Sequence, residues 1–263
     1  MLEKNGVHIA AISYDSQEIL AAFAQRHSIG YPLLSDKGSE TIRKFDIFNS
    51  NMAPDLRAYG VPHPVEYLVS TDGTVVKKYF VSNYQHRVTG SSVALREFGT
   101  VATGAPVVTL ESGALAVQIG LPLANAFAGQ EISFFADFAL QPGWRIYGAA
   151  VPEGYTKTSI TFESPNVVRQ KLELPAPEVL DIPALGEILP VYSGSFRGIG
   201  TLLLKHPLPE GPLILQGRLA CQQCSDTVCE PPETMPFELA LILEPFMISE
   251  RDKKLLEKQN RTT

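Results

Sequence analysis

The chain has 263 residues, of which 44% are hydrophobic and 19% are charged, a composition typical of folded proteins and not of disordered ones. Its formal net charge of −6 gives no support for binding to nucleic acid or to an anionic membrane surface. The length is sufficient for two domains of ordinary size. No apolar stretch approaches the ~18–20 residues of a membrane span, and the first residues show no signal-peptide pattern.

Residues 1–98 predict an α/β domain. The apolar run Val7–Tyr14 favours a buried strand, and Asp15 and Ser16 then offer an N-cap for a helix that reaches about His27. The rest of the domain predicts an extended segment at 31–36, a helix at 39–47, a hairpin of strands 65–70 and 75–80 around the turn 71–74, and a closing helix at 91–98.

The composition changes after residue 98. Residues 99–106 are small and uncharged and predict a linker, while residues 249–263 are a charged tail. Between them, residues 107–248 predict a second domain built from short strands punctuated by Pro and Gly, a spacing that favours a β-sandwich with Trp144 and Tyr147 in its core. The expected strands are 115–120, 131–140, 159–162, 167–172, 200–205, 213–219 and 237–243.

All three cysteines, Cys221, Cys224 and Cys229, lie within nine residues, and such clustering indicates chemistry. A strand at 212–220 enters the cluster. If it continues to Cys224, the side chains of Cys221 and Cys224 point to opposite faces, with their Cα atoms about 10 Å apart, beyond the roughly 7 Å limit for a disulfide. The turn-forming residues 225–227 allow a short loop to join the other two thiols. We therefore predict a Cys224–Cys229 pair with Cys221 as a spare.

Two chemistries compete at this cluster, a metal site and a dithiol. A zinc site lacks its second pair of ligands, with His206 as the nearest histidine, so we predict no metal and no cofactor. Asp226, Glu230 and Glu233 flank the thiols, and no Lys, Arg or His lies between Leu219 and Leu239. Negative charge keeps thiols protonated, which suits a carrier that reacts only when docked to a partner. Asp226, Glu230 and Cys221 are candidate modulators, and a purely structural disulfide remains the alternative.

The segment from Cys224 through Val228 to Cys229, followed by Glu230-Pro231-Pro232, lies between an apolar strand and the strand-like residues 235–243. With the upstream segments 143–147 and 155–162, it resembles the periplasmic amino-terminal domain of the DsbD thiol:disulfide interchange proteins over roughly residues 105–245. The resemblance implies an immunoglobulin-like β-sandwich, a periplasmic or secreted location, and electron transfer between redox proteins. The expected partners are thioredoxin-like proteins or a membrane electron donor.

The same resemblance assigns roles by position. Cys224 and Cys229 match the redox pair, and residues 190–194, with Val191 and Tyr192, fall where the family has an aromatic cap loop over the disulfide. Cys221 departs from the family pattern, in which that position is commonly aromatic. Glu187 is the single candidate for the acidic residues of the cap.

Residues 3–98 carry a second resemblance, through the segments 11–15, 31–36 and 59–64. They are similar to the carboxy-terminal two-thirds of an AhpC/TSA-type peroxiredoxin with a thioredoxin fold, in which Pro64 matches the cis-proline position. The strand and helix that carry that family's cysteines have no counterpart, and residues 1–220 contain no cysteine. We expect an incomplete thioredoxin-like domain without peroxidase activity, in a chain truncated from a longer secreted redoxin fusion; a degenerate domain repacked as a scaffold is the alternative.

The fold class expected from the sequence is therefore α/β plus all-β, an incomplete thioredoxin-like domain followed by an immunoglobulin-like β-sandwich. The expected function is thiol:disulfide exchange through Cys224 and Cys229. The alternative function is a non-enzymatic binding or scaffold module in which the same disulfide is structural.

Overall fold

The computed structural model describes residues 1–49, 59, 61–80, 87–182 and 187–245. The chain divides into two compact units, unit 1 (Met1–Val101) and unit 2 (Ala102–Thr263). The division falls within residues 99–106, which the sequence predicted as a linker. Each unit is described here by itself.

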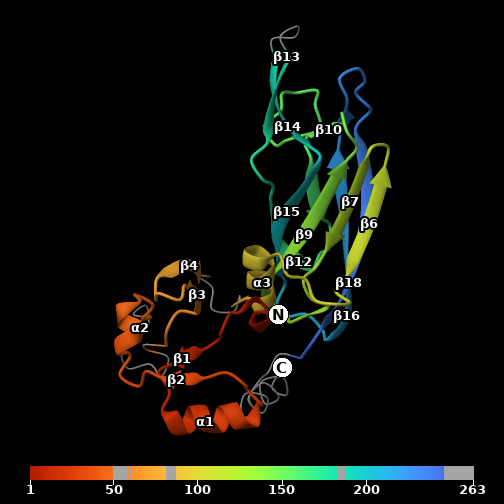
Figure 1. Ribbon diagram of the computed structural model, residues 1–263. Coiled ribbons are helices and arrows are strands. Elements are labelled where there is room, and N and C mark those ends of the chain that lie inside the picture. The colour runs from red at the N-terminus through yellow and green to blue at the C-terminus, as the bar shows by residue number, and fades with distance from the viewer. Residues whose placement is uncertain (50–58, 60, 81–86, 183–186, 246–263) are drawn as a thin grey trace. The chain divides into compact units, whose positions relative to one another are not determined.

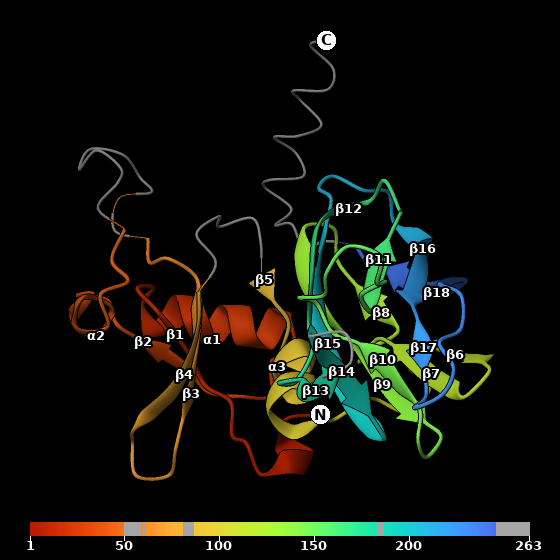
Figure 2. The same ribbon diagram turned by 90° about the horizontal axis from the view of Figure 1, so that it is seen from above.

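Unit 1 contains short helices and two separate strand pairs (Figure 1). β1 and β2 pair in parallel, β3 and β4 form an antiparallel hairpin, and α1 lies alongside β1 and β2 (Figure 2). The elements are η1 (Glu3–Asn5), β1 (Ala11–Ser13), α1 (Gln17–Arg26), β2 (Leu33–Ser35), α2 (Glu40–Lys44), β3 (Val65–Val69), β4 (Val75–Phe80), β5 (Arg87–Val88) and α3 (Gly90–Phe98).

In unit 1, the first residues of the helices agree with those expected from the sequence, whereas some helices and strands are shorter than expected. α1 begins after Ser16, whose Oγ accepts a hydrogen bond of 3.4 Å from the backbone N–H of Ile19, as an N-cap does. The strand expected at 7–14 is shorter, since only residues 11–13 pair with β2. The helix expected at 39–47 ends at Lys44, because Asp46 adopts the left-handed conformation with φ 55°.

The two strand pairs of unit 1 belong to different sheets in the described part of the chain. Ile12 and Leu34 are paired and lie on one face of the β1–β2 pair, and both side chains are exposed. The thioredoxin-like architecture of this unit stays a prediction.

Unit 2 consists almost entirely of strands arranged in three sheets (Figure 1). The first has the order β12-β15-β9-β7-β6, the second β11-β16-β18-β8, and the third β13-β14-β10-β17. The strands are β6 (Val107–Ser112), β7 (Leu115–Gly120), β8 (Asn125–Ala126), β9 (Gln130–Leu140), β10 (Arg145–Tyr147), β11 (Ser159–Phe162), β12 (Val167–Glu173), β13 (Glu178–Ile182), β14 (Glu187–Ser193), β15 (Ser195–Leu204), β16 (Gly211–Cys221), β17 (Gln223–Cys224) and β18 (Glu233–Leu243).

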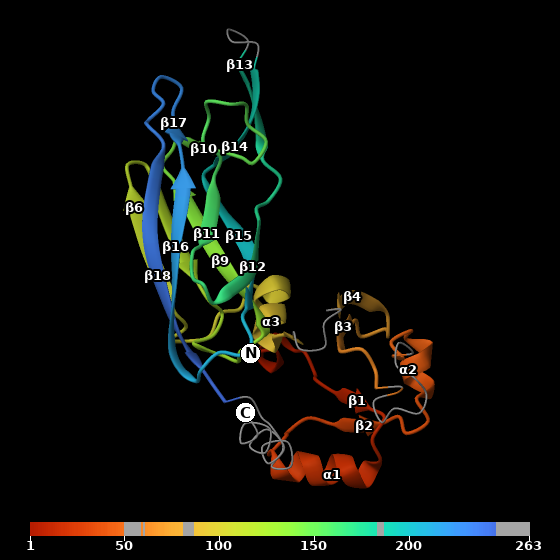
Figure 3. The ribbon, with the colours of Figure 1, turned by 180° about the vertical axis from the view of Figure 1, so that it is seen from behind.

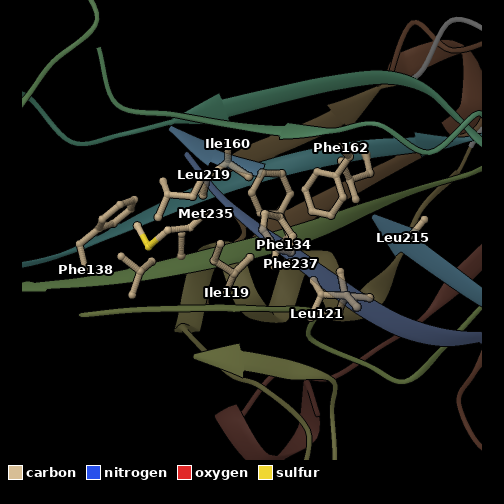
Figure 4. Packing of buried hydrophobic residues seen from close by; sticks show 14 of the residues in the cluster. Ile119, Leu121, Phe134, Phe138, Ile160, Phe162, Leu215, Leu219, Met235 and Phe237 are labelled. Atoms are coloured by element: carbon tan, nitrogen blue, oxygen red, sulfur yellow. The ribbon is translucent and has the colours of Figure 1, made fainter. Parts of the chain in front are cut away.

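The first two sheets pack face to face, with β9 and β7 toward the viewer in Figure 1 and β16 and β18 toward the viewer in Figure 3. β18 shows why they pack, since every second residue from Met235 to Leu243 is buried. Across the interior, the rings of Phe134 on β9 and Phe162 on β11 meet edge-on at a centroid distance of 5.0 Å (Figure 4). Within the second sheet, Phe162 also meets Phe237 edge-on at 5.3 Å. This confirms a β-sandwich, consistent with the expected immunoglobulin-like architecture.

Close approach of aromatic rings to the backbone explains two glycines in the sandwich. A Cβ atom at Gly200 would overlap the ring of Phe134, and one at Gly217 would overlap the ring of Phe237. Both positions require glycine for space, and not for an unusual φ angle.

The sequence located β7, β9, β11, β12, β15, β16 and β18 and missed several other strands. β6, β8, β13, β14 and β17 were not among the expected strands. β8 and β17 have two residues each, too few for a periodic pattern. β14 contains Pro190, which lowers its strand signal.

We predict that Phe134→Ala lowers the free energy of unfolding of unit 2 by about 3–5 kcal/mol, because it removes a fully buried ring and leaves a cavity. Val168→Ala, at a side chain that is 63% exposed, is the control and should change it by less than about 0.5 kcal/mol. Urea denaturation of the full chain measures both. Equal losses in the two variants would contradict the assignment of Phe134 to the core.

Candidate redox site

The three-residue strand β10 positions the residues around the cysteines. It pairs with β14 on one side and β17 on the other, so Arg145 lies opposite both Ser193 and Cys224, and Tyr147 lies opposite Val191. Directly paired residues, and residues two apart on a strand, share one face of a sheet. Arg145, Tyr147, Val191 and Cys224 therefore lie on one face of the third sheet, called here the cysteine face.

Cys224 and Cys229 form a disulfide with a Cα–Cα distance of 4.1 Å. The predicted pairing is thus present in the structure. The two residues also form an antiparallel bridge, and the backbone N–H of Glu230 donates to the carbonyl of Gln223 at 2.9 Å. The backbone consequently folds back on itself at the disulfide.

The loop between the cysteines is closed by Ser225. Its backbone N–H donates to the carbonyl of Val228 at 2.7 Å, and its Oγ accepts hydrogen bonds from the backbone N–H groups of Val228 and Thr227 at 3.1 and 3.3 Å. A serine that bonds the backbone two and three residues ahead is a recurrent turn former. The turn composition at 225–227 had predicted this loop.

The two sulfur-bearing residues differ in their exposure. Cys224 is only 3% exposed, whereas Cys229 is an exposed residue. Cys224 packs in a buried cluster with Tyr147, Leu189 and Val191. A reagent from solution therefore has access to the residue at one end of the disulfide and not to the other.

Tyr147 contacts the disulfide directly. Its hydroxyl lies 3.0 Å from Sγ of Cys224 and 3.5 Å from Sγ of Cys229, and it is the donor because disulfide sulfurs carry no hydrogen. Burial, followed by the negative charge of Glu187, raises the pKa of Tyr147, while Arg145 partly opposes that shift. The hydroxyl stays protonated and remains a donor at neutral pH. The sequence had assigned Tyr147 to the sandwich core; it lies instead in the cluster that holds Cys224.

A second tyrosine connects Tyr147 with Glu187. The ring of Tyr155 meets the ring of Tyr147 edge-on at a centroid distance of 4.9 Å, and the Tyr155 hydroxyl donates to the carboxylate of Glu187. That hydrogen bond to a carboxylate is the main reason why the pKa of Tyr155 is raised to about 12. Glu187, the candidate cap acid, thus reaches the disulfide only through two aromatic side chains.

The expected cap loop has a different conformation. Val191 and Tyr192 belong to strand β14, paired with β10 and β13, so the prediction of a loop at these residues is wrong. Val191 lies on the cysteine face and packs in the cluster with Cys224. Tyr192, one residue on, points to the opposite face and packs in the main core, where its ring stacks on Phe196 at 4.7 Å. Of the two predicted cap residues, only Val191 packs beside Cys224. Its role in shielding the disulfide stays a prediction.

Two glutamine side chains hydrogen-bond the cysteine segment to backbone groups of other segments and of its own loop. The side chain of Gln223 accepts from the backbone N–H of Ala114 at 2.9 Å and donates to the carbonyl of Ser112 at 3.0 Å. Gln222 accepts from the backbone N–H of Thr156 at 3.0 Å and donates to the carbonyl of Glu230 at 3.2 Å. The sequence analysis missed this role, since only tertiary contacts reveal it.

The charge around the disulfide also differs from the sequence expectation. Asp226 pairs with Arg145 through an Nη1–Oδ1 distance of 2.7 Å, so a cation from a distant strand lies beside the acidic segment. Glu230 is exposed, and Glu233 accepts a hydrogen bond of 2.5 Å from the Ser112 hydroxyl. Residues 220–238 carry no cation, as the sequence shows, but Arg145, from outside this segment, opposes the charge of Asp226.

Cys221 is a free thiol with no exposed surface and packs in the main core. Burial, together with the nearby charge of Glu233, raises its pKa to about 11. It lies in a different buried cluster from Cys224. Within the described ranges, no group of three or more His, Cys, Asp or Glu side chains is arranged to hold a metal ion.

Pro64 precedes β3 in unit 1 and is partly buried. The cis peptide bond of the described residues is His206–Pro207, so the expected cis-proline at Pro64 is not found. The sequence alone does not decide the isomer, because the two forms of an X–Pro bond differ by only about 0.5–1 kcal/mol.

Comparison with known protein families supports the resemblance predicted for each part of the chain. Residues 120–241 match the family model of the N-terminal domain of the thiol:disulfide interchange protein DsbD. Unit 2 resembles the DsbD N-terminal domain. Residues 1–78 match the model of the AhpC/TSA family, so unit 1 resembles an AhpC/TSA redoxin. The comparison with curated proteins gave no match.

Two solved structures have a partial likeness to this chain. The N-terminal periplasmic domain of ScsB from Proteus mirabilis has 18% identity and a TM-score of 0.39, covering 57% of this chain and 56% of that one. The reduced N-terminal domain of DsbD from Neisseria meningitidis has 13% identity and a TM-score of 0.30, covering 53% and 90%. This chain thus spans just over half the length of the ScsB structure. None of the helices in the described residues has the length and apolar content to cross a membrane.

We predict that Cys221 resists alkylation by iodoacetamide in the folded protein at pH 8, because its thiol is buried and its pKa of about 11 leaves about one thiolate in a thousand. Labelling should appear only in denaturant or as the pH approaches 11. Mass spectrometry of peptides after mild reduction measures this, with Cys229 as the internal control that reacts first. Rapid native labelling of Cys221 would contradict its burial.

Proposed function

We propose that the DsbD-like unit 2 is an electron-carrying thiol:disulfide exchange module that works through Cys224 and Cys229. One observation supports this most strongly: within the range that matches the DsbD family model, a disulfide joins an exposed cysteine to a buried one that contacts a tyrosine hydroxyl. A disulfide that serves stability alone gains nothing from an exposed end, whereas exchange requires one sulfur that a partner thiolate can reach.

The difference in exposure suggests the order of events. A partner thiolate attacks Sγ of Cys229, the bond to Cys224 breaks, and Cys224 leaves as a thiolate. The Tyr147 hydroxyl, 3.0 Å from that sulfur, donates a hydrogen bond to the developing charge. A second thiol of the partner then attacks the mixed disulfide and releases Cys229. Two electrons pass from the partner dithiol to the module, and the reverse reaction returns them.

The partners we propose are thioredoxin-like redox proteins or a membrane electron donor, in the periplasm or outside the cell. Support comes from the family match of residues 120–241, and the disulfide itself favours an oxidising compartment. All the cysteines of this chain lie in unit 2, so thiol chemistry in this chain belongs to that unit. We propose that the redoxin-like unit 1, which carries no cysteine nucleophile in this chain, does not reduce peroxides.

Equilibration of the full chain in graded glutathione and dithiothreitol buffers tests the proposal. We expect the Cys224–Cys229 bridge to titrate while the protein stays folded, at a potential above about −300 mV, as exchange disulfides do. Peptide mass spectrometry after alkylation measures the bridge, and circular dichroism monitors the fold. A bridge that is reduced only when unit 2 unfolds would assign the disulfide to stability and the chain to the alternative of a binding or scaffold module.

Single-cysteine variants test which sulfur is attacked. The reagent is a purified thioredoxin whose reactive cysteine is activated as a mixed disulfide. We expect the Cys229 thiol of Cys224→Ala to react with it at least tenfold faster than the Cys224 thiol of Cys229→Ala, because Cys229 is exposed and Cys224 is buried. Cys221→Ala is the control and should leave the wild-type rate unchanged. Equal rates for the two single-cysteine variants would overturn the proposed order.

Tyr147→Phe tests the hydrogen bond to the sulfur. The variant keeps the ring and its packing and removes the hydroxyl, so we expect reduction of the disulfide by dithiothreitol to slow about two- to tenfold, the net range of a typical hydrogen bond. Tyr192→Phe removes a hydroxyl that bonds the Pro175 carbonyl at 3.0 Å, away from the disulfide, and is the matched control. An unchanged rate in Tyr147→Phe would remove Tyr147 from the mechanism.

A further inference from the structure

An ion pair ties the middle of the cysteine loop to another strand. Asp226 lies two residues after Cys224 and three before Cys229, and its carboxylate is 2.7 Å from the guanidinium of Arg145 on β10. The side chain of Arg145 is 20% exposed and that of Asp226 is 77% exposed. The contact therefore joins a mostly covered cation in the sheet to an exposed acid on the loop.

Arg145 lies next to the cysteine in the backbone ladder as well. It is paired directly with Cys224 between β10 and β17. One residue of β10 thus positions both the strand that carries the buried cysteine and the loop that leads to the exposed one. The hydrogen bonds of Ser225 to Val228 close the turn, and those of Glu230 to Gln223 and Gln222 hold the far end of the loop. The ion pair adds a side-chain contact between the middle of the loop and β10.

We propose that Arg145 and Asp226 are positioning residues that set the redox equilibrium of the Cys224–Cys229 pair, an inference that rests on the proposed exchange function. In the reduced protein, a loop held against β10 keeps the two thiols close together and raises their effective concentration. A higher effective concentration favours the disulfide. Linkage makes the effect reciprocal, since the disulfide strengthens the ion pair by the same factor.

The reaction that reports this equilibrium balances in thiols and electrons. Two glutathione molecules each give up one proton and one electron, forming glutathione disulfide, while the Cys224–Cys229 bond takes up two electrons and two protons and becomes two thiols. The equilibrium constant of this reaction is the measured quantity. Ion pairs with an exposed member are weak, so we expect loss of the pair to make the disulfide easier to reduce by about two- to fivefold, equivalent to about 10–20 mV.

A direct effect of charge on the thiolates would act differently. If Arg145 worked as a cation that stabilises thiolate, Asp226→Asn would leave that cation unopposed and ease reduction, whereas Arg145→Gln would remove it and hinder reduction. Positioning requires both variants to ease reduction, by similar factors, because each breaks the same contact. The double variant should then equal either single one, since the contact is lost only once.

The experiment equilibrates the full chain with glutathione at pH 7 and quantifies the bridge by alkylation and mass spectrometry. The variants are Arg145→Gln, Asp226→Asn and the double substitution. Arg169→Gln is the control, because it breaks an ion pair of the same length, 2.7 Å to Glu131, between two strands of the first sheet. We expect the two single variants and the double variant to shift the equilibrium equally and the control to leave it unchanged.

Thermal unfolding of the oxidised proteins separates positioning from general stability. A variant set with lower unfolding temperatures but an unchanged redox equilibrium would overturn the inference, as would harder reduction of Arg145→Gln or additive effects in the double variant. If Arg145→Gln does not fold, Asp226→Asn carries the test, because its side chain is 77% exposed, together with the pH dependence of Cys229 alkylation in the reduced variant. A direct charge effect would shift that alkylation to lower pH, whereas positioning leaves it unchanged. A wild-type bridge that fails to equilibrate while folded rejects the exchange function itself. Equal equilibria in wild type and variants reject only the role of the ion pair.

Discussion

The hydrogen bonds of β10 to its two partners are the constraint on which the candidate site depends. This strand has three residues, and its register with β14 and β17 places Arg145 and Tyr147 on the same face as Cys224. A slip of one residue would reverse every side chain. Tyr147 and Arg145 would then point into the main core, and Ile146, which is fully buried there, would face the disulfide.

The main core of the sandwich holds this register in place. Ile146 and Tyr192 are directly paired across β10 and β14, and both pack among the residues of the first two sheets. Their burial is favourable only in the observed register, because the alternative would bury the Arg145 guanidinium. The third sheet is therefore an extension of the sandwich, with its inner face part of the core and its outer face carrying the disulfide.

The two ends of the disulfide have different environments, and the proposed exchange reaction uses that difference. Cys224 lies among aromatic and aliphatic side chains with one hydroxyl donor within reach, whereas Cys229 lies at the surface on a loop attached through Asp226. Attack from solution is thereby directed to one sulfur, and the other leaves into a protected site. The same arrangement keeps Cys221 out of the reaction, since its thiol lies inside the sandwich.

The sequence by itself determined the features that depend on local pattern. Alternation of apolar residues identified the long strands such as β18, the capping residue Ser16 marked the start of α1, and cysteine spacing with the turn at 225–227 indicated the Cys224–Cys229 pair. Only the tertiary structure decided which residues surround that pair. Arg145, Tyr147 and Gln223 reach the site through strand pairing and side-chain contacts between segments up to about a hundred residues apart, and strands of two or three residues leave no periodic signal. The negative charge of the cysteine segment can therefore be read from the sequence, but the cation that opposes it cannot. Electrostatic interactions depend on distance in space and not on distance along the chain.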